Sequence, residues 1–219
     1  GFVPTEEKIK CVDRLAASGL RKIEVSSFVS PRAVPQLADA EAVFQGITRL
    51  PGVIYAALVP NVRGMERAIA ARADEVNLVM SASESHNREN LRMSCDASFH
   101  AIKEAASLAA TAGLRVTASL SCSFGCPFEG EMPAATILMW CRRLQEEAGI
   151  RSLSLCDTTG MAYPALVQEL VGLVRRSSPE ANLTLHFHNT RGLGLANVFA
   201  GLDAGVINFD AALAGIGGC

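Results

Sequence analysis

Two histidines separated by a single residue form the strongest chemical signal in this sequence. His186 and His188 close the apolar run Leu183–His188, with Phe187 between them. Residues two apart on a β-strand point to the same face, with α-carbons about 7 Å apart, so two imidazoles can hold one divalent metal. A pair of surface or hydrogen-bonded histidines on an edge strand would show the same pattern. The polar loop that follows, Asn189–Gly192, favours a metal site.

Two carboxylates occupy comparable places. Asp157 follows the apolar run Leu153–Cys156, and Glu24 follows Ile23 within a β-rich segment. An acid at a strand end can cap a helix or bond a loop, or it can act as a base or as part of a metal's surroundings, and the sequence leaves both interpretations of Asp157 open. A buried Glu24 would need a partner, because an unpaired buried charge is costly. A catalytic arginine would be a natural one.

Cys219 ends the glycine-rich segment Gly215–Cys219. A thiol on a mobile loop over an active site can act as a general acid or a nucleophile. An ordinary thiol beside a turn would give the same pattern. The chain has seven cysteines, and an odd number without a secretory signal favours reduced thiols.

Seven β-rich runs alternate with amphipathic helical stretches, and these elements must position the polar residues. Alternating β and α units predict a parallel sheet with right-handed crossovers. The runs are Lys22–Phe28, Val53–Val59, Glu75–Met80, Arg115–Cys122, Ser152–Cys156, Leu183–His188 and Val206–Ala211.

Polar residues end five of these runs, which favours a (β/α)8 TIM barrel over an open sheet, because a barrel collects site residues from many strands. No Gly-x-Gly-x-x-Gly motif follows a strand. We expect residues 1–219 to form a single TIM-barrel catalytic domain of seven recognisable strands, truncated at both ends, with the first strand and a C-terminal segment missing. We expect surface roles for His86, on a polar loop, and for His100, on a helix.

Charge and hydropathy exclude some functions. The 219 residues include 20 basic and 22 acidic side chains, a formal net charge of −2. A dedicated nucleic-acid binder would normally carry a basic stripe. No run of 18 uncharged apolar residues is present, so we expect no membrane span.

Taken together, these segments resemble the 3-hydroxy-3-methylglutaryl-CoA (HMG-CoA) lyase family, in a superfamily of metal-dependent barrels that also holds isopropylmalate and homocitrate synthases. The resemblance covers essentially the whole chain. The segments that carry it are Ile23–Pro31 (IEVSSFVSP), Val34–Gln36, Gly125–Gly130 (GCPFEG), Asp157–Gly160, His186–His188, Leu195–Asn197 and Gly215–Cys219.

The resemblance implies a retro-Claisen cleavage of HMG-CoA to acetyl-CoA and acetoacetate, with Mg²⁺ or Mn²⁺ as the metal rather than Zn²⁺. It assigns roles to six residues: metal ligation to His186 and His188, catalysis to His186 as well, proton transfer to the enolate to Cys219, catalytic or supporting carboxylates to Asp157 and Glu24, and a place near the substrate to Ser27. The family's Arg-Asp pair and a further Asn ligand are expected outside this chain.

The resemblance also implies an acyl-CoA substrate and a homo-oligomer, a dimer, in the bacterial cytoplasm or, alternatively, the mitochondrial matrix. Asn189 stands where the family usually has Asp, and Arg191 where it has an aromatic residue. A lyase for a related 3-hydroxy-acyl-CoA such as citramalyl-CoA therefore remains an alternative. So do a condensing synthase of the same superfamily and a non-catalytic barrel remnant that binds a small molecule.

Overall fold

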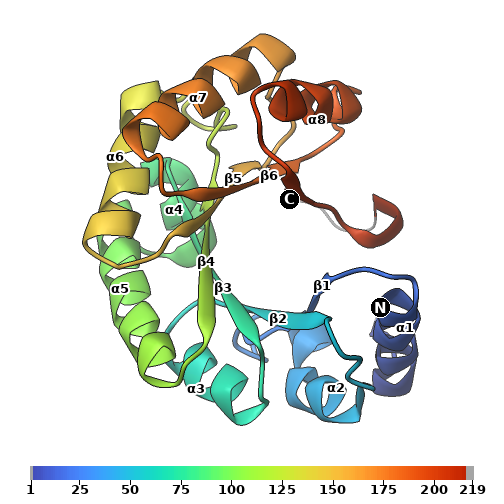
Figure 1. Ribbon diagram of the computed structural model, residues 1–219. Helices are drawn as coiled ribbons and strands as arrows, with labels where there is room; N and C mark the ends of the chain where they lie inside the picture. Colours follow the sequence, from blue (N-terminus) through green and yellow to red (C-terminus); the bar gives the residue numbers. More distant parts are fainter. Residues whose placement is uncertain (1, 216–219) are drawn as a thin grey trace. The chain divides into compact units, whose positions relative to one another are not determined.

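The computed structural model describes residues 2–215, and the chain divides into two compact units. The first unit comprises residues 1–78 and 104–116, and the second comprises residues 79–103 and 117–219. Each unit is built from parallel strands that alternate with helices (Figure 1). The parallel α/β architecture expected from the sequence is therefore confirmed in both units.

The first unit carries strands β1, β2 and most of β3, paired in parallel in that order. Its helices bury one apolar face each: in α3, for example, Met65 and Ala68 are fully buried. Its elements are α1 (Thr5–Ala17), β1 (Lys22–Ser27), η1 (Pro35–Leu37), α2 (Ala40–Gly46), β2 (Ile54–Val59), α3 (Val62–Ala70) and β3 (Glu75–Ser81). Helix α5 (Cys95–Thr111) and strand β4 (Arg115–Ser121) contribute residues to both units.

The second unit carries the rest of β4 and then β5, β6 and β7, each parallel to the next. Helices α6, α7 and α8 pack against one another in sequence order, and α8 packs on β6 (Figure 1). The elements of this unit are α4 (Glu84–Leu91), α6 (Ala134–Glu146), β5 (Ser152–Asp157), α7 (Pro164–Ser177), β6 (Asn182–Phe187), α8 (Gly194–Asp203), β7 (Asn208–Asp210) and η2 (Leu213–Gly215).

Helical periodicity explains how α6 and α7 cover this sheet. Each helix buries four side chains at positions i, i+3, i+4 and i+7, the spacing that places residues on one face. These residues are Ile137, Trp140, Cys141 and Leu144 in α6, and Val167, Leu170, Val171 and Val174 in α7. Strand β5 is buried almost throughout, as expected for a parallel strand covered by helices.

The sequence did not indicate α4, and the expectation of a polar loop around His86 was wrong. The segment is almost entirely polar, so it lacks the apolar stripe that marks a helix. It nevertheless forms a helix because Ser83 caps it, its hydroxyl accepting a hydrogen bond from the His86 N–H at 3.1 Å. His86 is half-buried on this helix, with its ring centroid 6.4 Å from that of Phe128.

Two further expectations concern membranes and thiols. Within residues 2–215, no helix is both long and apolar enough to cross a membrane. The six cysteines in the described part of the chain are free thiols, as expected: Cys11, Cys95, Cys122, Cys126, Cys141 and Cys156. Cys219 lies outside the described residues.

Candidate active site

His186 and His188 lie at the carboxyl end of β6 and point toward each other. Their Nε2 atoms are 3.1 Å apart and their ring centroids 5.0 Å apart. Phe187, between them, packs instead against Phe124, with ring centroids 5.6 Å apart. The alternation of a strand therefore brings two imidazole nitrogens together, as the spacing predicted.

The neighbouring strand β7 supplies a carboxylate to the first of these histidines. Asp210, the last residue of β7, is the register partner of His186. Its Oδ1 makes a short hydrogen bond with Nδ1 of His186. Asp210 was not identified from the sequence. A signal was present, because Asp210 is a polar residue at the end of a β-rich run, as Asp157 is, but only five of the seven runs were recognised as ending in polar residues.

Asp157 ends β5 and is only 1% exposed. Its Oδ1 accepts hydrogen bonds from the backbone N–H groups of Met161 at 2.7 Å and Ala162 at 3.1 Å. Its buried Oδ2 has no hydrogen-bond partner among residues 2–215. The loop-bonding interpretation of Asp157 therefore describes Oδ1, and the interpretation as a base or as part of a metal's surroundings stays a prediction for Oδ2.

The charges around Asp157 and His188 influence each other. Burial raises the pKa of the Asp157 carboxyl above its usual range, and the two backbone N–H bonds, His188 and Arg191 offset part of the rise. Burial lowers the pKa of the His188 imidazole; the neighbouring His186 lowers it further, and Asp157 acts in the opposite direction. A neutral His188 keeps a nitrogen lone pair, which metal ligation requires.

The loops that follow β5 and β6 are in close contact. Gly160 has φ +70°, and a Cβ atom added there would lie 2.6 Å from both Cβ and Oγ1 of Thr190. Only glycine meets the backbone and the space requirement together. The segment Asp157–Gly160 therefore packs closely against Thr190, in the loop that follows His188.

Asn189 has a structural contact of its own. Its side-chain Oδ1 accepts a hydrogen bond from the N–H of Gly194, the first residue of α8, at 3.0 Å. The backbone oxygen of Asn189 also accepts from Gly192 N–H at 3.0 Å. Asn189 therefore stabilises the turn into α8, a task for which an aspartate carboxylate would be equally suitable.

Glu24 and Ser27 lie on β1, in the first unit, whereas the two histidines and Asp157 belong to the second. Glu24 is exposed rather than buried, and its Oε2 accepts a hydrogen bond from Asn77 Nδ2 at 3.1 Å. The condition of a buried Glu24 is therefore not met: Ile23 is buried and Glu24 is exposed, as on a strand with alternating faces, and a register shift follows between Glu24 and Ser26. Ser27 is buried, and its Oγ accepts from Val29 N–H at 3.4 Å.

Arg67 holds the segment that follows Ser27. Its Nη1 donates to the backbone oxygens of Phe28 at 3.3 Å and Val29 at 3.1 Å. Its Nε and Nη2 form a two-point contact with the Glu41 carboxylate, which holds the pKa of that carboxyl below its usual range. A bidentate arginine–carboxylate pair fixes the guanidinium in one orientation. Arg67 was not identified from the sequence, because nothing in its spacing distinguishes it from a surface arginine.

The two imidazoles fit a divalent cation. Two nitrogens bound to one ion at about 2.1 Å and a right angle would lie about 3.0 Å apart, close to the observed 3.1 Å. No cluster of three or more His, Cys, Asp or Glu side chains with metal-binding geometry is found between residues 2 and 215. Two ligands from this part of the chain are therefore what the structure offers.

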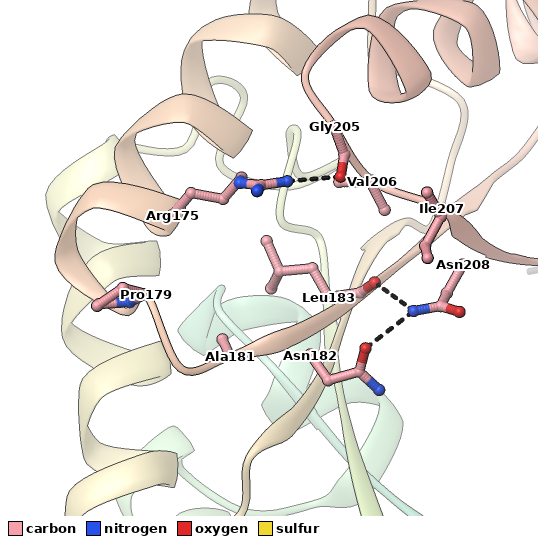
Figure 2. A pocket seen from close by; sticks show the side chains of 9 residues that line it. All are labelled: Arg175, Pro179, Ala181, Asn182, Leu183, Gly205, Val206, Ile207 and Asn208. Atoms are coloured by element: carbon pink, nitrogen blue, oxygen red, sulfur yellow. Dashed lines mark hydrogen bonds between the residues drawn. The ribbon is translucent and has the colours of Figure 1, made fainter.

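A small cavity at the other end of the strands shows no such chemistry. It has a volume of about 120 Å³ and lies at the amino ends of β6 and β7 (Figure 2). Asn208 Nδ2 donates to Asn182 Oδ1 at 2.9 Å, and Arg175 donates to the backbone oxygen of Gly205. These polar side chains of the cavity hydrogen-bond one another or the backbone. The candidate site is therefore assigned to the carboxyl ends of the strands, where the two imidazoles converge.

The fold, in which parallel strands alternate with helices, matches that of a known enzyme family. The HMGL-like family model matches residues 2–219. The hydroxymethylglutaryl-CoA lyase of Bacillus subtilis is 43% identical over 221 residues, covering 100% of this chain and 73% of the relative. The chain belongs to the HMGL-like family.

Two solved structures are similar over the whole chain. The HMG-CoA lyase of Bacillus subtilis superposes with a TM-score of 0.97 at 42% identity, covering 100% of this chain and 73% of that one. An HMG-CoA lyase of Acinetobacter baumannii, solved with coenzyme A and 3-methylmalate, superposes with a TM-score of 0.95 at 45% identity, covering 100% and 71%. The expected fold class, the TIM barrel of the HMG-CoA lyases, is confirmed, with seven of its strands in residues 2–215.

Replacing Asn189 tests its structural role. The variant Asn189→Ala should lower the free energy of unfolding by about 1 kcal/mol, because the Gly194 N–H loses its acceptor. The variant Asn189→Asp should keep or raise stability, by about 0.3–1 kcal/mol, since a negative charge near a helix N-terminus is favourable. Chemical denaturation measures both. Asn90→Ala, an exposed position on α4, serves as the control, and equal stability of the Asn189→Ala variant and the unaltered protein would contradict the assignment.

The raised pKa of Asp157 predicts a pH-dependent cost. Between the unfolded pKa of about 3.9 and the higher folded pKa, folding takes up a proton. The stability of the metal-free protein should therefore fall as pH rises through that window. Asp157→Asn removes this cost, so its stability relative to the unaltered protein should be greatest near neutral pH and should decline as pH falls to about 4. Urea unfolding at several pH values measures the difference, with Asp203→Asn, at an exposed position of α8, as the control; a difference that does not vary with pH would refute the prediction.

Proposed function

We propose that this protein is a carbon–carbon lyase that cleaves HMG-CoA to acetyl-CoA and acetoacetate by a metal-dependent retro-Claisen reaction. The observation that carries the proposal is the similarity of the whole chain to HMG-CoA lyases, at 43% identity to the enzyme of Bacillus subtilis. The convergence of His186 and His188 agrees with it. The bound coenzyme A of the Acinetobacter baumannii relative supports an acyl-CoA substrate.

The reaction requires loss of the C3 hydroxyl proton, breakage of the C2–C3 bond and protonation of the resulting acetyl-CoA enolate. His186 and His188 would hold a divalent cation, Mg²⁺ or Mn²⁺ rather than Zn²⁺. When bound, the cation supplies Lewis-acid polarisation and a template for the substrate's hydroxyl and carbonyl or carboxylate oxygens. Enzymes of this family are generally dependent on a divalent metal. The identity of the metal is part of the proposal.

The residues of the chain then have separate tasks. The Asp157 carboxylate lies close enough to His188 to act on its pKa, so its negative charge would favour a cation held by that imidazole. The tight loop from Asp157 to Gly160 keeps that carboxylate in place. Glu24 is proposed as a second catalytic or supporting carboxylate, and Ser27 as a group near the substrate.

Cys219 is proposed as the acid that gives its thiol proton to the enolate carbon, forming the methyl group of acetyl-CoA. A group that donates a proton in this step must regain it before the next turnover. We also propose that residues 1–219 belong to one catalytic domain, that the protein is a dimer and that it acts in the bacterial cytoplasm, the last in keeping with its similarity to the Bacillus subtilis enzyme.

The Asn189 contact bears on the choice of substrate. The family's usual Asp at this position raised the alternative of a related 3-hydroxy-acyl-CoA. Because the Asn189 side-chain oxygen is engaged with Gly194 N–H, the replacement keeps a loop contact and needs no change of substrate. HMG-CoA is therefore the substrate that we propose over citramalyl-CoA.

Release of acetyl-CoA from HMG-CoA with added Mg²⁺ tests this function in the full-length protein. His186→Ala should lower kcat/KM by at least about 100-fold, because changes even to groups behind metal ligands cost 10–100-fold. His100→Ala is the control, since His100 is exposed on α5 and its contact is with Asp96 at 3.5 Å. The same assay with acetyl-CoA and a 2-oxo acid detects a synthase. The absence of cleavage by the unaltered protein would sink the lyase proposal.

The thiol role predicts a separate loss. Cys219→Ser should reduce kcat by about 10²–10⁴-fold, the usual range for loss of an acid or base, while Mn²⁺ affinity stays unchanged. Cys11→Ser, on α1, should retain full turnover. Turnover of the Cys219→Ser variant within threefold of the unaltered protein would remove Cys219 from the mechanism.

A further inference from the structure

The carboxylate of Asp210 contacts the imidazole of His186. It lies on β7, beside His186 in the parallel register, and its Oδ1 hydrogen-bonds Nδ1. The other ring nitrogen, Nε2, faces Nε2 of His188 at 3.1 Å. His186 is thus contacted at both ring nitrogens, by Asp210 at Nδ1 and by His188 at Nε2.

The chemistry of a carboxylate determines which nitrogen carries the proton. An ionised carboxylate can only accept hydrogen bonds. Contact with Asp210 therefore requires the proton of a neutral His186 to be on Nδ1, so that Nε2 presents its lone pair toward His188. This is the tautomer that an Nε2 metal ligand needs, and a carboxylate behind the ring also raises the basicity of the ligand nitrogen.

The second histidine has no equivalent support. Across residues 2–215, the hydrogen-bonding contact of His188 is with His186, and Asp157 influences it only through charge. The two ligands are therefore unequal: one ring is fixed by a hydrogen bond from the neighbouring strand, and the other is fixed by backbone position and by its neighbour.

We propose that Asp210 is a positioning residue that fixes the tautomer and the ring orientation of His186 for a divalent cation. The inference rests on the proposed function, in which His186 is a metal ligand. It gives a residue of β7 a role that the resemblance to the HMG-CoA lyase family did not imply. Asp210 itself touches neither metal nor substrate in this proposal.

Mn²⁺ affinity tests the proposal without reference to turnover. Free Mn²⁺ is titrated by electron paramagnetic resonance in the full-length protein, in Asp210→Asn and in Asp210→Ala. Both variants should bind Mn²⁺ about 10–100-fold more weakly, the usual effect of removing a group behind a ligand. Asp203→Asn, an exposed aspartate at the end of α8, should bind as the unaltered protein does.

Nitrogen-15 NMR of the histidine side chains gives a second readout in the unaltered, metal-free protein, so the proposal can be tested even if a variant fails to fold. The neutral His186 ring should carry its proton on Nδ1, and in Asp210→Asn the other tautomer should become populated, because an amide can also donate. A predominant Nε2–H tautomer in the unaltered protein would overturn the proposal.

His186→Ala separates this inference from the ligand assignment on which it rests. Loss of Mn²⁺ affinity in His186→Ala and in Asp210→Asn supports both. Loss in His186→Ala, with Asp210→Asn within twofold of the unaltered protein, overturns the role of Asp210 and leaves the proposed function standing. Unchanged affinity in both variants overturns the ligand assignment and the positioning role together, whereas the lyase activity itself is decided by acetyl-CoA release.

Discussion

The parallel register of β5, β6 and β7 determines where the polar groups of the candidate site lie. Cys156 pairs with His186, and His186 with Asp210, so three strand ends are aligned to within a residue. In a parallel sheet all carboxyl ends meet at one edge, and helices cover the faces. Backbone hydrogen bonds thereby place at the same edge of the sheet side chains that are more than fifty residues apart in the sequence, such as Asp157 and Asp210.

The same constraint explains how much the sequence could predict. The period of a strand sufficed to place His186 and His188 on one face, and the end of an apolar run sufficed to place Asp157. Asp210 was missed although the predicted run Val206–Ala211 contains it, because the strand is only Asn208–Asp210 and its end could not be placed from the run. Glu24 was expected to pair with an arginine if it were buried; it is exposed and contacts Asn77 on β3, a partner more than fifty residues away that the local sequence does not show.

Contacts made by neutral or distant groups were the least predictable. Asn189 could be noticed as a departure from the family pattern, but its role depends on a backbone N–H five residues later, which only the fold of the loop reveals. Arg67 contacts the segment after β1 from a helix nearly forty residues away. Local pattern identifies elements and their faces, whereas partners across loops depend on how the chain closes on itself.

Asp157 combines two demands that oppose each other. Its Oδ1 gains two backbone hydrogen bonds, and its Oδ2 is buried without a partner in the described part of the chain. Burying an unpaired polar atom costs about 1–3 kcal/mol, and retention of such a group in a fold is typical of sites at which stability and chemistry compete.

The contact between Gly160 and Thr190 has a consequence for how this site can change over time. A Cβ atom at residue 160 would meet Thr190 Cβ, which no change of rotamer moves, and the left-handed backbone at residue 160 also favours glycine. Related chains should therefore retain glycine here unless the loop after β6 is displaced. The conformation of the loop after β5 thus depends on the loop after β6, although 29 residues separate Gly160 from residue 190 in the sequence.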